Sequence, residues 1–181
     1  MTRVKPWREI RREHLLDCRI FEVERSVAES PIDGSVHDYY RVLSRDWVQI
    51  VPVTEAGEVV MVRQYRHGSS TLVLEIPGGL IDEGEDPAVA AARECLEETG
   101  YAAEHVQLMS DLSPNPAIHA HRLRAYYARD VRKTGEIQNT ATEQTEVELV
   151  PLAELEGRLR AGEIDHALIA STLWQFLHDY A

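Results

Sequence analysis

Hydrophobic and polar positions along the chain fall into several short runs that are typical of β-strands. The runs WVQIVPV (47–53) and EVVMVRQY (58–65) are rich in β-branched residues and are separated by a turn at Gly57, so we predict that they form a hairpin. Residues 19–43 predict two short strands around the turn signal at 31–34. Further strands are predicted at 71–76, 105–109, 122–128 and 145–150.

A helix over about 87–99 is marked at both of its ends. Asp86 is a suitable N-cap residue, and Pro87 fits the first helical position, where its missing N–H is not needed. Gly100 fits the left-handed position that ends many helices. The sequence therefore predicts both boundaries of this helix from local signals.

Two further helices are predicted to close the chain. The first carries leucines at helical spacing between residues 152 and 159 and ends near Gly162. The second spans 165–180, with Asp165 as its N-cap. Their apolar stripes indicate core packing and suggest no chemistry.

The helix at 87–99 is predicted to have two unlike faces, because successive residues are turned by 100°. The glutamates share one arc, and like charges at this spacing cost roughly 0.2–0.5 kcal/mol per pair. A solvated acidic face would explain them, but a GlyGly loop precedes the helix, and such a loop lets the backbone approach an ion closely. Carboxylates in this setting suit Mg²⁺ or Mn²⁺. The predicted packing arc holds Ala88, Ala92, Cys95, Leu96 and Thr99, and the predicted solvent-facing arc holds Glu94, Glu97 and Glu98.

Composition narrows the classes of protein that fit. The chain has 181 residues and a formal net charge of −12, which gives no electrostatic footprint for a nucleic-acid backbone. Only Cys18 and Cys95 are present, so a disulfide scaffold and a four-cysteine zinc site are excluded. No apolar run approaches a membrane span, and the N-terminus lacks the apolar stretch of a signal peptide. We expect a cytoplasmic protein with no membrane or nucleic-acid partner.

The acidic helix lies inside a longer motif with fixed spacing. Gly79, five residues, Glu85, seven residues and RECLEETGY (93–101) resemble the Nudix box, G-x5-E-x7-R-E-U-x-E-E-x-G-U with U apolar, at every fixed position. The runs MVRQYRHG (61–68) and EQTEVELVPLAEL (143–155) extend the resemblance to the ADP-ribose pyrophosphatase branch of the Nudix hydrolases.

This resemblance implies a fold, a domain division and an activity. The implied fold is an α/β/α sandwich of the α/β class on a mixed β-sheet, with a small N-terminal β region. The hydrolase domain would span 47–181, and residues 1–46 would serve dimerisation and substrate binding in a homodimer. The implied activity is Mg²⁺-dependent hydrolysis of the pyrophosphate bond of ADP-ribose or a related nucleoside diphosphate sugar. An NADH or dinucleotide pyrophosphatase and a non-catalytic nucleotide sensor are the alternatives.

The resemblance also implies the residues that would hold the metal ion. Glu94 and Glu98 would be the principal ligands, and Glu97 and the carbonyl of Gly78 would complete the coordination. Glu97 would also be a catalytic residue. Four further positions of the box would be structural, of which two would brace the loop against the helix. The bracing pair is Glu85 and Arg93, and the structural glycines are Gly79 and Gly100.

The remaining expected site residues lie outside the box. By resemblance, Glu143 would assist or deprotonate the attacking water, with Glu146 and Glu148 as nearby alternatives. Arg66 is the best phosphate clamp, because a guanidinium can bind two phosphate oxygens at once. Glu75, beside the GlyGly loop, would either accept hydrogen bonds from ribose or brace Arg66.

Overall fold

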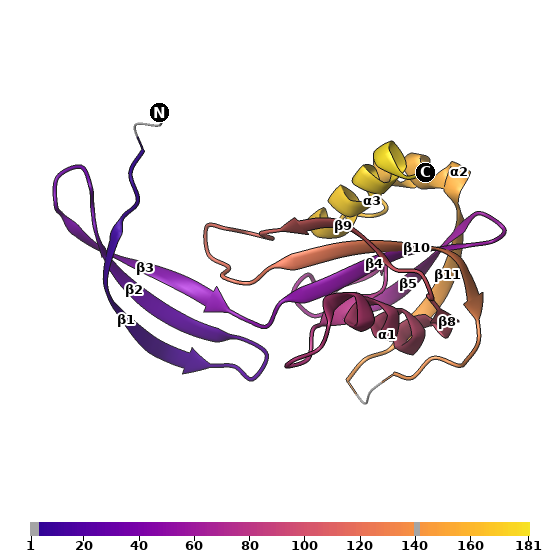
Figure 1. Ribbon diagram of the computed structural model, residues 1–181, viewed down its shortest axis with the longest axis horizontal. Helices are drawn as coiled ribbons and strands as arrows, with labels where there is room; N and C mark the ends of the chain where they lie inside the picture. Colours follow the sequence, from indigo (N-terminus) through magenta and orange to yellow (C-terminus); the bar gives the residue numbers. More distant parts are fainter. Residues whose placement is uncertain (1–3, 140–141) are drawn as a thin grey trace. The chain divides into compact units, whose positions relative to one another are not determined.

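The structure, a computed structural model, describes residues 4–139 and 142–181 (Figure 1). The chain forms two compact units. The smaller unit contains residues up to Arg45 together with Ser113–Arg122, and the larger contains Asp46–Leu112 and Leu123–Ala181. Ser113–Arg122, which the sequence assigned to the 47–181 domain, thus lies in the N-terminal unit. No helix within the described ranges is long and apolar enough to cross a membrane.

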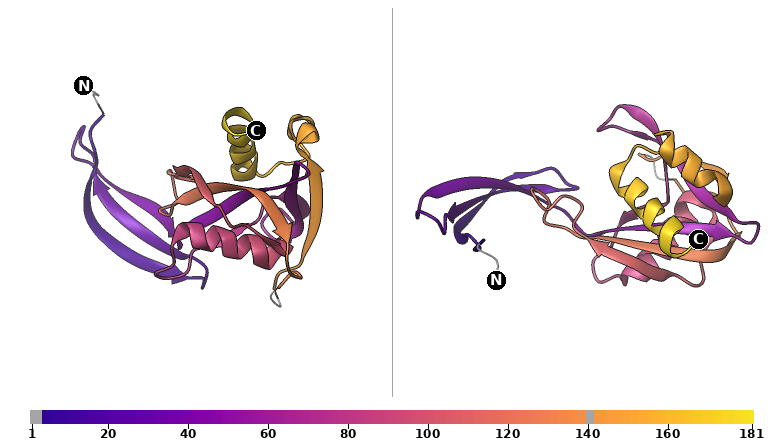
Figure 2. Two further views of the ribbon diagram at one scale, coloured as in Figure 1. Left: turned by 45° about the vertical axis from the view of Figure 1, so that its right-hand side comes forward. Right: turned by 90° about the horizontal axis from the view of Figure 1, so that it is seen from above.

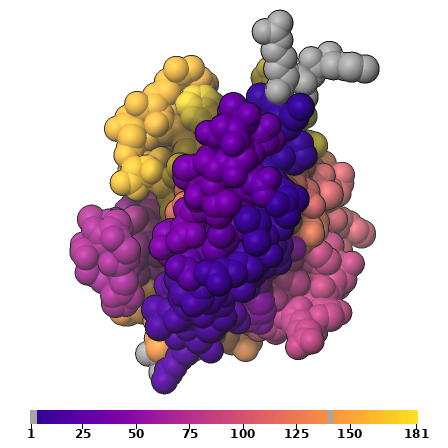
Figure 3. Space-filling model, turned by 90° about the vertical axis from the view of Figure 1, so that its left-hand side faces the viewer, coloured from indigo at the N-terminus to yellow at the C-terminus, as the bar shows by residue number. Residues whose placement is uncertain are grey.

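The N-terminal unit is a three-stranded antiparallel sheet in the order β1-β2-β3. Two of its strands match those predicted within 19–43, but β1 was missed, because its ten residues are all exposed and carry no burial pattern. The segment Ser113–Arg122 joins β3 through backbone hydrogen bonds of Val42 with Ile118 and Ala120. The surface of the three strands is drawn in indigo to purple in Figure 3. The strands are β1 (Arg8–Asp17), β2 (Glu22–Glu29) and β3 (Val36–Leu43).

The larger unit is built on an eight-stranded mixed sheet with the central order β11-β5-β4-β10-β8. β4 pairs parallel with β10 and antiparallel with β7, while β5 pairs with β6 and β11. The predicted hairpin therefore exists only next to its turn, where Val53 pairs with Val59. The strands are β4 (Trp47–Thr54), β5 (Glu58–Arg66), β6 (Thr71–Glu75), β7 (Gly78–Leu80), β8 (Tyr101–Ala102), β9 (Gln107–Leu112), β10 (Leu123–Lys133) and β11 (Thr145–Pro151).

Helices cover both faces of this sheet (Figure 2). Side chains along a strand alternate between faces, so β4 contributes to two separate cores. Val48 and Ile50 pack with the α1 side, whereas Val51 and Val53 pack with the α2 and α3 side, where Phe176 is fully buried. The expected α/β/α sandwich is confirmed. The helices are α1 (Pro87–Thr99), α2 (Leu152–Arg160) and α3 (Ala167–Asp179).

Local signals predicted the ends of α1 correctly and the start of α3 incorrectly. The Asp86 side chain accepts hydrogen bonds from two amides of the first turn of α1, and Gly100 has φ +75° at its end. Helix α3 begins at Ala167, and its N-cap is His166, whose ring accepts from the amide of Ile169. The cap is thus one residue later than the predicted Asp165.

The predicted faces of α1 were wrong in one important respect. Its buried residues are Ala90, Ala91, Cys95 and Thr99, so the packing arc is rotated from the predicted one. At 100° per residue, this arc includes the positions of Glu94 and Glu98. Two of the three glutamates therefore face the protein rather than the solvent.

Candidate active site

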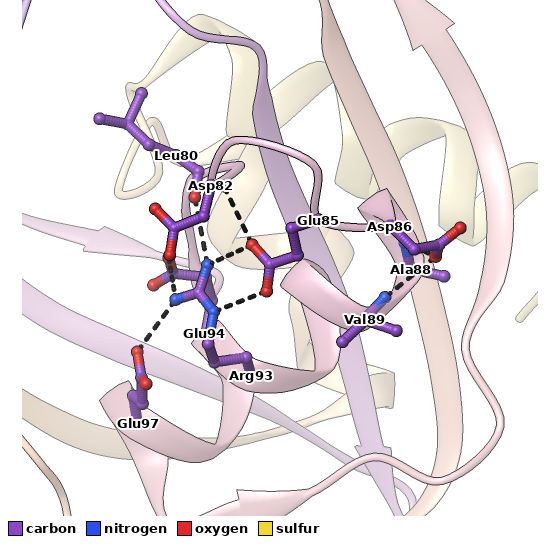
Figure 4. A network of polar contacts seen from close by, with 9 residues as sticks. All are labelled: Leu80, Asp82, Glu85, Asp86, Ala88, Val89, Arg93, Glu94 and Glu97. Carbon is purple, nitrogen blue, oxygen red and sulfur yellow. Dashed lines mark hydrogen bonds and ion pairs between the residues drawn. The ribbon is translucent and has the colours of Figure 1, made fainter.

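The guanidinium of Arg93 joins the loop before α1 to the helix itself (Figure 4). Its Nε and Nη2 atoms each lie 2.9 Å from a carboxylate oxygen of Glu85, which is a two-point contact. Nη2 also donates to the carbonyl of Leu80 at 3.2 Å. Nη1 donates to Glu94 at 2.8 Å and to Glu97 at 3.1 Å. The acidic neighbours, Glu85 first, hold the pKa of Arg93 well above its usual range, so the loop and three glutamates are tied to one permanent positive charge.

Glu94 and Glu98 are acids in a poorly solvated place. Burial raises the pKa of Glu98 to about 8, and the negative charge of Glu94 adds to the effect. Its Oε2 accepts a hydrogen bond from the amide of Gly78 at 2.9 Å, which only partly offsets the burial. Burial likewise raises the pKa of Glu94, with contributions from the charges of Glu97 and Glu143. Two desolvated carboxylates beside one another favour either a bound proton or a bound cation.

The two glycines predicted to lie in a loop belong to strand β7, and they let this strand lie against both β4 and α1. A Cβ atom at Gly78 would lie 2.4 Å from the carbonyl oxygen of Val48, and backbone cannot move aside easily. A Cβ atom at Gly79 would lie 2.5 Å from Oε1 of Glu94. The first glycine is required by the sheet, and the second leaves room for the carboxylate.

At the other end of the helix, Gly100 lies close to the backbone of Gly135. Its φ of +75° is left-handed, and a Cβ atom there would lie 2.3 Å from the carbonyl oxygen of Gly135. The box glycine thus ends α1 and lets the chain after β10 pass close by. These two demands explain why only glycine fits.

Of the three candidate late acids, Glu143 is the one that acts electrostatically on Glu94 and Glu98. Its negative charge contributes, after burial, to the raised pKa values of Glu94 and Glu98. Glu146 pairs in register with Arg63 on the opposite face of the sheet, because its neighbour Thr145 pairs with Gln64. Glu146 and Glu148, two residues apart on β11, therefore both lie on the sheet face turned away from α1.

Glu148 is engaged elsewhere as well. Its carboxylate contacts Arg63 at 2.7 Å and also contacts Arg158 from α2. Hydrogen bonds from these two arginines lower its pKa despite the opposing effect of burial. Glu148 thus stabilises the packing of α2 on the sheet, and its side chain lies on the sheet face turned away from Glu94 and Glu98.

Glu75 is buried and fully occupied by neighbours on its own sheet face. It is 1% exposed and accepts hydrogen bonds from Arg66 at 2.6 and 3.1 Å and from Gln64 at 3.2 Å. Of the two expected roles, the geometry favours bracing Arg66 over contacting ribose. The side chain of Arg66 is 47% exposed, so part of the guanidinium faces outward.

Three polar residues at the site, Gln64, Asn139 and Thr145, were not predicted from the sequence. Gln64 holds Glu75, and strand alternation from Arg66 was the signal that could have found it. The hydroxyl of Thr145 lies 3.0 Å from the carbonyl of Glu98 and 2.9 Å from Oδ1 of Asn139. No local pattern predicts this contact, because it joins a strand to a helix far away in the sequence.

The donor set fits a hard divalent cation. In the ranges 4–139 and 142–181, no three acidic, histidine or cysteine side chains already converge on one point. Glu94 and Glu97 instead turn to Arg93, and Glu98 turns to the amide of Gly78. Carboxylate and carbonyl oxygens are the ligands that Mg²⁺ and Mn²⁺ prefer, and desolvated acids gain most from a cation.

Known proteins similar to this chain agree with the geometry. The NUDIX domain family model matches residues 43–171. A methanol dehydrogenase activator from Bacillus methanolicus is 30% identical over 146 residues, which cover 81% of this chain and 76% of that protein. An ADP-ribose pyrophosphatase from Mycobacterium tuberculosis is 36% identical over 124 residues, covering 67% and 59% of the two chains.

A solved structure extends the similarity to the whole fold. The crystal structure of an ADP compounds hydrolase superposes with a TM-score of 0.87 at 25% identity, over 98% of this chain and 96% of that one. The resemblance inferred from the box is confirmed by the family match and by these relatives. The chain therefore belongs to the Nudix family, as a Nudix hydrolase related to the ADP-ribose pyrophosphatases.

Proposed function

We propose that this Nudix hydrolase cleaves the pyrophosphate bond of ADP-ribose or a closely related nucleoside diphosphate sugar in the presence of Mg²⁺. The products would be a nucleoside monophosphate and a sugar phosphate. The observation that carries the proposal is the pair of desolvated carboxylates, Glu94 and Glu98, held in the packing arc of α1. The relatives named ADP-ribose pyrophosphatase support the choice of substrate.

The metal would be held by residues of α1 and the loop before it. Glu94, Glu97 and Glu98 would supply carboxylates, and Gly78 would supply its carbonyl. A bound divalent cation neutralises phosphate oxygens and lowers the pKa of coordinated water. Arg93 orients the carboxylates of Glu94 and Glu97 by donating a hydrogen bond to each.

The other residues would bind the diphosphate and prepare the water. Arg66 would grip phosphate oxygens with the outward part of its guanidinium while Glu75 fixes the rest. Glu143 would accept a proton from the attacking water, or orient that water toward phosphorus. The electrostatic influence of Glu143 on Glu94, Glu98 and Arg66 supports this placement.

The proposal also gives residues 1–46 a role in dimerisation and substrate binding. The N-terminal unit exposes large side chains that a homodimer contact would cover, which supports this role. They include Trp7, Ile10, Leu16, Tyr39 and Tyr40.

A substrate panel tests the proposed function. We expect ADP-ribose and other nucleoside diphosphate sugars to be hydrolysed with Mg²⁺ at kcat/KM values at least about tenfold above that of NADH, a difference of roughly 1.4 kcal/mol in transition-state binding. The measurement is phosphate released after coupling to a phosphatase. A panel in which NADH is the best substrate would move the assignment to the dinucleotide class.

The contact between Gly79 and Glu94 gives a prediction about metal affinity. In Gly79→Ala the added methyl would occupy the place of the Glu94 carboxylate, whose flexible side chain can swing away without unfolding the protein. We expect Mn²⁺ affinity, measured by calorimetric titration, to fall by roughly 10- to 100-fold, as for other changes that disturb a metal ligand.

A matched substitution controls for the extra methyl group. Gly157 in α2 has open space around its Cβ position, so Gly157→Ala should leave Mn²⁺ affinity unchanged. An unchanged affinity in Gly79→Ala as well would show that Glu94 does not bind the ion.

A further inference from the structure

The chain that follows β10 is bonded to the C-terminal end of α1. The amides of Thr134 and Gly135 donate to the carbonyl of Gly100 at 2.9 and 3.1 Å, and the amide of Gln138 donates to the carbonyl of Glu97 at 2.7 Å. The last carbonyls of a helix lack partners within the helix, so these contacts complete its hydrogen bonding. They also fix this part of the chain to the last turn of α1, which carries Glu97 and Glu98.

Thr145 makes a further contact with that turn, at the first residue of β11. The residue is 8% exposed, and its hydroxyl lies within hydrogen-bond distance of the carbonyl of Glu98 and of Oδ1 of Asn139. This buried hydroxyl is specific, because removing it takes a hydrogen-bond donor away from the carbonyl of Glu98 in the last turn of the helix. An apolar residue of similar size would fill the space without this connection.

The position of Thr145 in the chain gives the contact a consequence for the site. It lies two residues after Glu143, the acid whose charge reaches Glu94, Glu98 and Arg66. The carbonyl that it contacts belongs to Glu98 itself. A single hydroxyl thus links the backbone of Glu98, the expected metal ligand, to the part of the chain that follows Glu143, the acid expected to act on water.

We propose that Thr145 is a positioning residue, whose hydroxyl anchors the start of β11 to the last turn of α1 and thereby holds Glu143 in place for its action on water. The inference rests on the proposed function. The side-chain amide of Asn139 lies beside the same hydroxyl, whose single proton is donated to the carbonyl of Glu98. Thr145 itself need not touch the substrate.

The test compares Thr145→Val with Thr145→Ser at saturating Mg²⁺. Valine keeps the shape and removes the hydroxyl, so kcat for ADP-ribose should fall about tenfold or more while KM stays within about twofold, since small misplacements of a catalytic group are costly. Serine keeps the hydroxyl and should restore most of kcat. Thr172→Val is the matched control, because this threonine is also buried and its hydroxyl contacts Gln49 far from Glu143 in the chain. It should lower the melting temperature without lowering kcat.

A double-mutant cycle decides whether Thr145 acts through Glu143. In a Glu143→Gln background, Thr145→Val should have little further effect on kcat, because the group that it positions is already gone. An equal fold loss in both backgrounds, or a loss that rising Mg²⁺ restores, would overturn the inference. A wild-type kcat in Thr145→Val would overturn it too.

The same experiment separates this inference from the proposed function. If wild-type protein does not hydrolyse ADP-ribose or any other nucleoside diphosphate sugar, the proposed function fails before any variant is compared. If Glu143→Gln loses turnover but Thr145→Val does not, only the positioning role fails. If Glu143→Gln itself turns over like wild type, both the proposed role of Glu143 and the positioning role are wrong.

Discussion

Replacement of Glu98 by glutamine is expected to cost most of the enzyme's turnover while leaving the fold intact. The amide keeps the size and the contact with Gly78 but removes the charge that would balance a cation. At limiting Mg²⁺ we expect kcat/KM for ADP-ribose to fall by at least about 10²-fold, in line with the loss of one charged contributor to transition-state stabilisation. Glu104→Gln, a change at an exposed acid after β8, is the control and should be silent.

The same variant carries a signature in pH-dependent stability. In metal-free protein, the folded state holds the Glu98 proton up to a pKa of about 8, whereas an ordinary glutamate releases it near 4.5. Because the folded state binds the proton more tightly, the free energy of unfolding falls as pH rises from about 4.5 to about 8. Glu98→Gln lacks this decline, so in chelator it should melt above wild type at pH 8 and close to it at pH 4.

Metal binding should reverse this dependence in the wild type. The ion must displace the proton, so Mn²⁺ affinity should rise with pH up to about 8. Thermal unfolding at several pH values, with and without Mn²⁺, checks both trends. Wild-type turnover in Glu98→Gln at limiting Mg²⁺, or a lower melting temperature than wild type at pH 8 in chelator, would contradict the ligand role.

Glu143→Gln is expected to show a loss of a different kind. A residue that orients or deprotonates the nucleophile should, when changed to the amide, lower kcat by roughly 10²- to 10⁴-fold with little change in KM. The loss should persist at saturating Mg²⁺, because Glu143 is not expected to hold the metal. The measurement is kcat against Mg²⁺ concentration and pH, where loss of a base should also flatten the rise of kcat toward alkaline pH.

The register of β11 supplies the control for this variant. Glu146 lies opposite Arg63, on the sheet face turned away from α1, so Glu146→Gln removes an equal charge three residues away. It should leave kcat within about twofold of wild type. A larger and metal-insensitive loss in Glu146→Gln than in Glu143→Gln would show that the wrong acid has been assigned.

Features of α1 that depend on neighbouring residues could be predicted, and features that depend on packing could not. The cap at Asp86 and the left-handed Gly100 follow from local backbone chemistry. The orientation of Glu94 and Glu98 does not, because a rule that turns acids to solvent fails where a site holds them in the packing arc. The error therefore fell at the residues expected to be functional.

The strands show the same limit. Strand β4 was evident from its β-branched run, but its parallel partner β10 lies far away in the sequence, and no alternation reveals it. Strand β1 is exposed along its whole length, and β7 contains the GlyGly pair, so neither has the burial pattern that marks a strand. The contact of Thr145 with Glu98 depends on these long-range pairings and was correspondingly absent from the sequence prediction.

The most direct test of the account is a Mg²⁺ titration of metal-free protein with ADP-ribose as substrate, with AMP and ribose phosphate separated by chromatography. We predict no turnover in chelator, and a saturable rise with Mg²⁺ in which the two products appear in equal amounts. Full turnover after complete removal of divalent cations would contradict the central claim that Glu94, Glu97 and Glu98 of α1 act by holding a metal ion.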